Sequence, residues 1–246
     1  MGWGLTGLVL FLVTWQVVGM RTNPVFFSTP TGVAASAGPV FEKGHLLSLY
    51  LNTMKIYLVG LALATFLGVS LGILTGLNRR ARYLLDPLAV AAYSTPSLVL
   101  IPVFILWFGT GDPAKIALML FTGIFPNLVN TQLGVDQMGP QMSELGRSFG
   151  ANRRELLTQI VLPAIVPYSM AGVRLAVPRA FVAILAAEML ITAGGVGGLI
   201  VQYGDQFQTS FYFVPVILIV LTSYVLTELV KLLERRLSPW AKDRRA

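Results

Sequence analysis

The chain has 246 residues and a formal net charge of +7, and 55% of its residues are hydrophobic while only 12% are charged. Soluble domains carry about 25% charged residues, so this composition excludes an ordinary water-soluble globule and indicates a membrane protein. There is no cysteine and one histidine, His45, which excludes disulfides, thiolate chemistry and a zinc cluster, and we expect this chain to hold no metal or cofactor.

Six stretches are long and apolar enough to cross a bilayer as helices, which takes about 20 residues each. In chain order they cover residues 3–20, 52–78, 87–109, 114–135, 162–191 and 208–232. Apolar residues occupy all sides of each predicted helix, which excludes amphipathic surface helices. We therefore predict an all-α, polytopic membrane protein in which residues 1–246 form a single transmembrane domain. The first stretch could instead be a signal peptide, although it lacks the positively charged start of such peptides.

The basic residues predict the orientation of these spans. Twelve of them lie after the second and fourth stretches or at the end of the sixth and beyond it: Arg79, Arg80, Arg82, Arg147, Arg153, Arg154, Lys231, Arg235, Arg236, Lys242, Arg244 and Arg245. The positive-inside rule then places both termini in the cytoplasm. This arrangement also accounts for the net charge, so no nucleic-acid partner is needed.

Glycines of the second stretch predict close helix packing. Gly68, Gly72 and Gly76 recur every four residues, with Gly60 further toward the N-terminus. Such small-residue ridges let two membrane helices approach closely. We interpret this ridge as structural.

The segment 136–160, between the fourth and fifth stretches, is too long for a turn and too regular for disorder. Its apolar residues recur on one helical face: Met138, Met142, Leu145 and Phe149. Gly150 interrupts the pattern, and Asn152 with Glu155 three residues later forms a capping box for a second helix. The segment is thus either a helix pair that seals the bundle or a docking element for a soluble partner.

Several residues of this segment match the sequence pattern of a known protein family. Five residues stand in the spacing E-x5-G-x9-I-x-L-P: Glu144, Gly150, Ile160, Leu162 and Pro163. This spacing resembles the cytoplasmic EAA signature of membrane subunits of bacterial binding-protein-dependent ABC importers. Leu145 and Gly146 replace the two alanines of that signature.

Further motifs resemble the nitrate/sulfonate/taurine (aliphatic sulfonate) branch of this family. They are residues 85–87 (Leu-Asp-Pro), residues 102–109, residues 187–190 with the glycines of 194–198, and the pair Gly172 and Arg174. The resemblance covers the chain from about Tyr50 to the C-terminus. Where that branch often has a tryptophan, the fifth stretch has Phe181.

The resemblance implies a permease subunit of the bacterial inner (cytoplasmic) membrane, working as a homodimer with a dimer of ABC ATPase subunits. An extracytoplasmic solute-binding protein would deliver a small, anionic solute. ATP and Mg would bind to the ATPase, because this chain has no G-x-x-x-x-G-K-[ST] motif. The helix before Gly150 would be the coupling helix. The residues that this assigns to ATPase coupling are Glu144, Leu145, Gly146, Arg147, Ser148 and Gly150.

Three charged residues lie deep in the fifth stretch: Arg174, Arg179 and Glu188. A charge at mid-bilayer costs about 2.5 kcal/mol or more, so such residues usually face the protein interior or a wet cavity. Arg174 could instead extend to the cytoplasmic surface, and Glu188 could make an interhelical hydrogen bond or act at an outer gate beside the glycines of 194–198.

Polar residues next to prolines are further candidates for the solute pathway. Ser94 and Thr95 precede Pro96, and Asn127 follows Pro126. Prolines free backbone carbonyls that cavity water or neighbouring helices must satisfy. The alternative role of these polar side chains is to hold one helix to another.

Two other classes of membrane protein are alternatives to an importer permease. An ion-gradient-driven secondary transporter usually has inverted repeats, and we detect none between the halves of this chain. An intramembrane enzyme needs a nucleophile with a base, or a metal site. H-E-x-x-H is absent, and the spacing G-x-S-x-G occurs at residues 68–72 and 146–150, within predicted helices and not at the strand-to-helix turn that this motif requires. We therefore predict a transporter subunit and not an enzyme.

Overall fold

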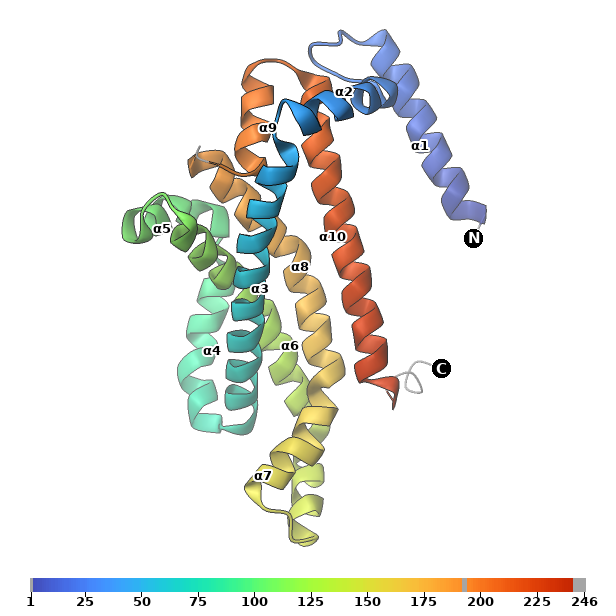
Figure 1. The fold of residues 1–246 in the computed structure, drawn as a ribbon. Coiled ribbons are helices and arrows are strands. Elements are labelled where there is room, and N and C mark those ends of the chain that lie inside the picture. Colours follow the sequence, from blue (N-terminus) through green and yellow to red (C-terminus); the bar gives the residue numbers. More distant parts are fainter. Residues whose placement is uncertain (1, 192–193, 241–246) are drawn as a thin grey trace. The chain divides into compact units, whose positions relative to one another are not determined.

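The computed structural model describes residues 2–191 and 194–240, and every regular element in these two ranges is helical. This confirms the predicted all-α fold. The helices, shown in Figure 1, are α1 (Gly2–Arg21), α2 (Pro30–Glu42), α3 (Leu46–Leu77), α4 (Arg79–Ser94), η1 (Ser97–Leu100), α5 (Ile101–Phe108), α6 (Asp112–Ser148), α7 (Arg153–Glu155), η2 (Leu156–Val161), α8 (Leu162–Ile191), α9 (Val196–Asp205) and α10 (Thr209–Leu237).

The chain divides into two compact units. Unit 1 comprises Met1–Lys55 and Leu185–Thr222, and unit 2 comprises Ile56–Ile184 and Ser223–Ala246. The helices α3, α8 and α10 contribute residues to both units.

Five helices are long and apolar enough to cross a membrane: α1, α3, α6, α8 and α10. Five of the predicted stretches lie within these helices, and none of their predicted ends falls more than one residue outside the helix. A bent pair, α4 with the segment Ser97–Phe108, raises the number of candidate spans to six if the pair counts as one. Two helices, α2 and α9, form where the sequence suggested only connections.

The third predicted stretch, residues 87–109, differs from the expected single helix. The helix α4 begins earlier, at Arg79, and the chain then turns by 93° before Ser97. Pro96 has no N–H group and forces the preceding residue out of the helical region, so Thr95 is extended, with φ −76° and ψ 124°. The Thr95 hydroxyl donates to the carbonyl of Ala91 at 2.9 Å, which satisfies an acceptor at the broken end.

The predicted boundary between the fourth span and the following segment is also different. No loop separates them, because α6 continues to Ser148 and is interrupted only at Gly139, with φ 70° and ψ 162°. On the other side, α7 leads through the π-helix η2 directly into α8. We call residues 140–161 the elbow.

The interior of unit 2 depends on the predicted glycine ridge. A Cβ atom at Gly68 would lie 2.5 Å from the carbonyl oxygen of Ile124, and one at Gly72 would lie 2.6 Å from the Cβ of Thr131. At Gly76 the same atom would meet Val135 at 2.6 Å. Helices α3 and α6 therefore approach each other as closely as the ridge predicts.

Candidate functional site

The elbow turns at Gly150. The amides of Phe149, Gly150 and Ala151 donate to the carbonyls of Leu145, Arg147 and Gly146 at 3.1, 2.9 and 3.0 Å. Gly150 has φ +83°, in the left-handed region that favours glycine. The glycine turn predicted from the sequence is therefore present.

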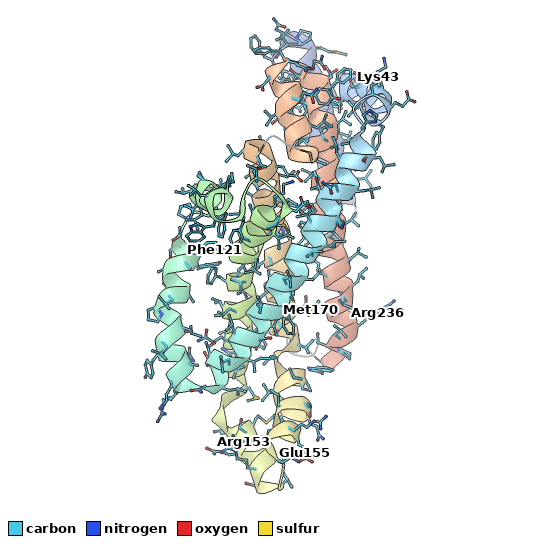
Figure 2. All side chains as sticks on the ribbon, turned by 60° about the vertical axis from the view of Figure 1, so that its left-hand side comes forward. Lys43, Phe121, Arg153, Glu155, Met170 and Arg236 are labelled. Atoms are coloured by element: carbon cyan, nitrogen blue, oxygen red, sulfur yellow. The ribbon has the colours of Figure 1, made fainter. Side chains whose placement is uncertain are left out.

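The return arm of the elbow starts with the predicted capping box. Asn152 Oδ1 accepts from the amides of Arg154 and Glu155 at 2.9 and 3.0 Å, and Glu155 Oε2 accepts from the Asn152 amide at 2.8 Å. The elbow projects beyond the ends of α3 and α4 in unit 2, and Arg153 and Glu155 lie near its tip (Figures 1 and 2). The capping box therefore stabilises the start of the return arm near the projecting tip.

The two arms of the elbow pack on each other through Gly146. A Cβ atom at this position would lie 2.5 Å from Ile160 Cδ1 and 2.6 Å from Leu156 Cδ2. Gly146 is buried, whereas Leu145 beside it is exposed. A small residue is therefore needed at position 146. Leu145, which replaces the other alanine of the signature, leaves the packing of the two arms unaffected.

Three of the four residues of the predicted apolar face are exposed, and the fourth, Met138, packs against the buried cluster that includes Val161. Met142, Leu145 and Phe149 keep 49%, 53% and 83% of their surface exposed. We call these three residues the elbow stripe. Residues that only sealed the bundle would be buried, so the exposure of the stripe favours the docking hypothesis.

The charged and polar candidates of the first arm, Glu144, Arg147 and Ser148, are also exposed. Ser148 Oγ donates to the carbonyl of Glu144 at 3.0 Å. The Glu144 carboxylate makes no hydrogen bond or ion pair within residues 2–191 and 194–240. The backbone bonds and the capping box, and not Glu144, hold the turn.

Arg174 is paired within unit 2. Its Nη1 lies 3.2 Å from Oε2 of Glu234 on α10. Both residues line a cavity of about 700 Å³, together with Lys231, Arg235 and Trp240. Arg174 thus has a counter-ion in the last turn of α10, so its side chain extends toward that end of unit 2, as the alternative interpretation expected.

Arg179 lies in a different cavity of unit 2, of about 290 Å³. Its Nη1 donates to Tyr93 Oη at 2.7 Å, and its guanidinium carbon lies 5.0 Å from the centre of the Tyr93 ring. Thr95 and Ser97, on either side of the break at Pro96, line the same cavity. Phe121 also lines it and lies beside α5, with its ring centre 6.0 Å from that of Phe104 (Figure 2).

Glu188 is buried within unit 1. Its Oε1 accepts from Thr53 Oγ1 at 2.8 Å, and its Oε2 accepts from the amide of Gly197 at 3.0 Å. Thr53 Oγ1 also accepts from the amide of Val196 at 3.1 Å. These bonds attach the start of α9 to α3 and α8, and the predicted role at an outer gate stays a prediction.

The remaining two candidates are apart from these cavities. Ser94 is exposed and lines neither of the two cavities described here. Asn127 is fully buried, its Nδ2 donates to the carbonyl of Gly123 at 2.8 Å, and it packs against Gly68 and Gly172. The position of Asn127 favours a packing role over a pathway role.

Within unit 2 the structure therefore groups Thr95 with Arg179 in one cavity and places Arg174 in another, while Glu188 belongs to unit 1. Sequence reasoning missed the partners Tyr93, Thr53 and Glu234. Of these, only Glu234 could have been found from the sequence, because it is an acidic residue close to the end of the last predicted span and an arginine within a membrane helix needs a counter-ion.

The chain matches known proteins over most of its length. The sequence model of the binding-protein-dependent transport system inner membrane component matches residues 64–242. The formylaminopyrimidine transport permease protein ThiX of Halalkalibacterium halodurans is 30% identical over 95% of this chain and 94% of its own. The taurine transport system permease protein TauC of Escherichia coli is 26% identical over 94% of this chain and 86% of its own. The nitrate import permease protein NrtB of Synechococcus elongatus is 27% identical over 94% of this chain and 88% of its own.

Two solved structures share the fold. A chain of the MetNI methionine ABC transporter in an inward-facing conformation superposes with a TM-score of 0.66 at 18% identity, covering 78% of this chain and 96% of that one. A chain of an amino acid ABC transporter gives a TM-score of 0.58 at 17% identity, covering 81% and 97%.

Proposed function

This chain belongs to the binding-protein-dependent transport system inner membrane components, and we propose that its elbow is the element through which a separate ABC ATPase dimer drives import. The chain is a permease subunit of the nitrate/sulfonate/taurine branch and not an enzyme. The proposal extends to its partners, its orientation in the membrane and the class of its solute.

The observation that carries the proposal is the exposed elbow stripe on a rigid, projecting turn. Met142, Leu145 and Phe149 offer an apolar surface, and Glu144 and Arg147 offer charges beside it. Exposed apolar side chains with a polar rim are typical of protein interfaces. A groove on the ATPase with apolar walls would therefore fit this part of the elbow.

The connections of the elbow explain how force would reach the membrane. The first arm follows the spanning part of α6 after the kink at Gly139, and the second arm leads through η2 directly into α8, so a displacement of the elbow would act on both helices and most directly on α8. In a permease homodimer, ATP binding would draw the two ATPase subunits and both elbows together, and hydrolysis would release them. This is a two-state, rigid-body switch in which ATP favours one state.

The distribution of basic residues supports a cytoplasmic elbow and cytoplasmic termini. In unit 2 the start of α4, the elbow and the end of α10 lie toward the same end of the unit (Figure 1). These segments carry Arg79, Arg80, Arg82, Arg147, Arg153, Arg154, Arg235 and Arg236. The positive-inside rule assigns such an end to the cytoplasm.

The proposed solute is small and anionic, delivered by an extracytoplasmic solute-binding protein. Nitrate, named for one relative, is an anion, and taurine, named for another, carries a sulfonate group; both support this class, whereas the formylaminopyrimidine named for a third relative is not an anionic solute. ATP and Mg would be bound by the ATPase, because this chain has no phosphate-binding motif of the Walker type.

Co-purification of the ATPase tests the docking proposal. We expect Gly150→Arg and Glu144→Lys to leave the permease in the membrane but to remove most of the ATPase from the purified complex. Gly38→Arg is the matched control, because a Cβ atom at Gly38 on α2 would meet nothing within 4 Å. Stoichiometric ATPase on both elbow variants would refute the docking role.

Uptake measurements distinguish the proposal from an ion-gradient-driven transporter. In vesicles that hold the permease, its ATPase and the solute-binding protein, uptake should stop when internal ATP is removed while the ion gradients are held. Uptake that continued without ATP, and stopped when the gradients were dissipated, would favour the secondary transporter.

A further inference from the structure

The three charged residues of α8 are balanced in different ways. Arg174 is paired with Glu234, and Glu188 accepts hydrogen bonds from Thr53 and Gly197. Arg179 has a tyrosine partner, Tyr93, but no carboxylate partner within residues 2–191 and 194–240. Arg179 is therefore a cation of α8 whose charge no described group neutralises.

The position of Arg179 along α8 keeps its side chain from reaching either end of the helix. It lies 17 residues after Leu162 and 12 residues before Ile191. At about 1.5 Å per residue these separations are roughly 26 and 18 Å, more than an arginine side chain spans. Because an unpaired charge in hydrocarbon costs about 2.5 kcal/mol or more, the guanidinium must face a wet cavity.

The cavity of about 290 Å³ at the break of α4 and η1 meets this requirement. Its polar wall is formed by Tyr93, Thr95 and Ser97, and its apolar wall by Phe121, Phe125 and Val182. Ligand pockets range from about 300 to 1,000 Å³, so this one suits a small solute. A guanidinium has five N–H donors, and Arg179 gives one of them to Tyr93, which leaves donors for an oxyanion.

We infer that this cavity is a contact site for the transported solute, in which Arg179 supplies the counter-charge to the sulfonate or carboxylate head of a small organic anion. The rings of Phe121 and Phe125 would cover its short apolar body. The inference rests on the proposed function and adds the site and the chemistry of recognition. A fixed positive charge attracts anions into a low-dielectric cavity and repels cations, which gives selectivity along a pathway.

The natural absence of cysteine allows a direct test in the assembled complex. Ser97→Cys places a single thiol in the wall of the cavity. Its reaction rates with the anionic sulfonatoethyl and the cationic trimethylammonioethyl methanethiosulfonates report the local potential. Arg179→Gln should lower the anionic-to-cationic rate ratio at least about tenfold, because one nearby charge acts with opposite sign on the two reagents.

Two variants serve as controls for this measurement. Arg179→Lys keeps the charge and should keep the ratio within about threefold, since Coulomb attraction depends on charge and distance. Arg236→Gln removes the same unit charge from the exposed end of α10 within unit 2, away from Phe121 (Figure 2), and should leave the ratio unchanged. An unchanged ratio in Arg179→Gln, or a thiol that neither reagent reaches, would overturn the inference.

Protection of the same thiol tests the class of ligand. Ethanesulfonate should slow the labelling of Ser97→Cys, its neutral analogue dimethyl sulfone should not, and Arg179→Gln should abolish the protection. Equal protection by dimethyl sulfone would refute recognition by charge, and protection by nitrate alone would refute an organic anion. ATPase retention is measured on the same samples, so a failure of docking is recognised separately from a failure of this site.

Discussion

Nη1 of Arg174 lies 3.2 Å from Oε2 of Glu234, and the two residues join α8 to α10 inside unit 2 although they are 60 positions apart in the sequence. The two opposite charges form a nearly neutral pair. Because Glu234 lies three residues before the end of α10, the pair holds the Arg174 guanidinium toward the end of unit 2 that carries Arg235 and Arg236.

Removing one partner of this pair should cost stability. We expect Glu234→Gln to lower the free energy of unfolding in detergent by about 1–3 kcal/mol, because it leaves the Arg174 charge without a counter-ion. The double variant Arg174→Gln, Glu234→Gln should recover part of the loss, since neither position then carries a charge. Chemical denaturation of all four proteins in a double-mutant cycle measures the coupling. A double variant whose loss equals the sum of the single losses would contradict the pairing.

The size of residue 146 should determine whether the elbow assembles. Gly146→Ala should be tolerated, because the atoms it would meet, Ile160 Cδ1 and Leu156 Cδ2, are the ends of flexible side chains. Gly146→Leu should separate the arms and reduce ATPase retention several-fold. Leu145→Ala provides the matched comparison on the exposed face. Retention of ATPase by Gly146→Leu at the wild-type level would show that the packing of the arms is not required.

The backbone conformation at position 150, and not the space around it, should determine which residues are tolerated there. A Cβ atom at Gly150 would meet nothing within 4 Å, yet φ is +83°. Gly150→Ala should therefore destabilise the elbow by about 1 kcal/mol and Gly150→Asn by less, because asparagine tolerates the left-handed region. Hydrogen exchange of the Ala151 amide, which donates to Gly146, would report this order. Equal exchange in both variants and the wild type would indicate that the turn is not strained.

The attachment of α9 should depend on Thr53. Thr53→Val keeps the shape of the side chain but removes the hydroxyl that bonds Glu188 and accepts from the Val196 amide. We expect that amide to exchange about fivefold faster, which corresponds to the loss of one hydrogen bond of about 1 kcal/mol. Thr158→Val, on the exposed side of η2, is the control. Unchanged protection of Val196 would mean that other contacts hold α9.

Local features of this chain could be predicted from the sequence, and long-range pairings could not. The turn at Gly150 and the box of Asn152 and Glu155 have all their partners within five positions, so spacing alone identifies them. The pairs Arg179 with Tyr93 and Glu188 with Thr53 are separated by 86 and 135 positions. No periodicity within one helix contains that information.

The break at Pro96 could be predicted from the sequence only in part. A proline in an apolar stretch predicts a disturbed helix, because it lacks an N–H group and restricts the residue before it. The 93° angle between the two helices depends on how α5 packs against α6, which involves residues further along the chain. The sequence therefore indicated where the helix would be disturbed and not that the disturbance would form one wall of a cavity.

The π-helix η2 determines how the side chains of α8 are rotated about the helix axis relative to the elbow. Its six residues, Leu156–Val161, widen the coil between the elbow and α8. Deleting one of them would turn all later side chains of α8 by about 100° relative to the elbow. Arg174 would then face away from Glu234 and Arg179 away from Tyr93. The six residues of η2 therefore determine whether the two arginines of α8 face their partners.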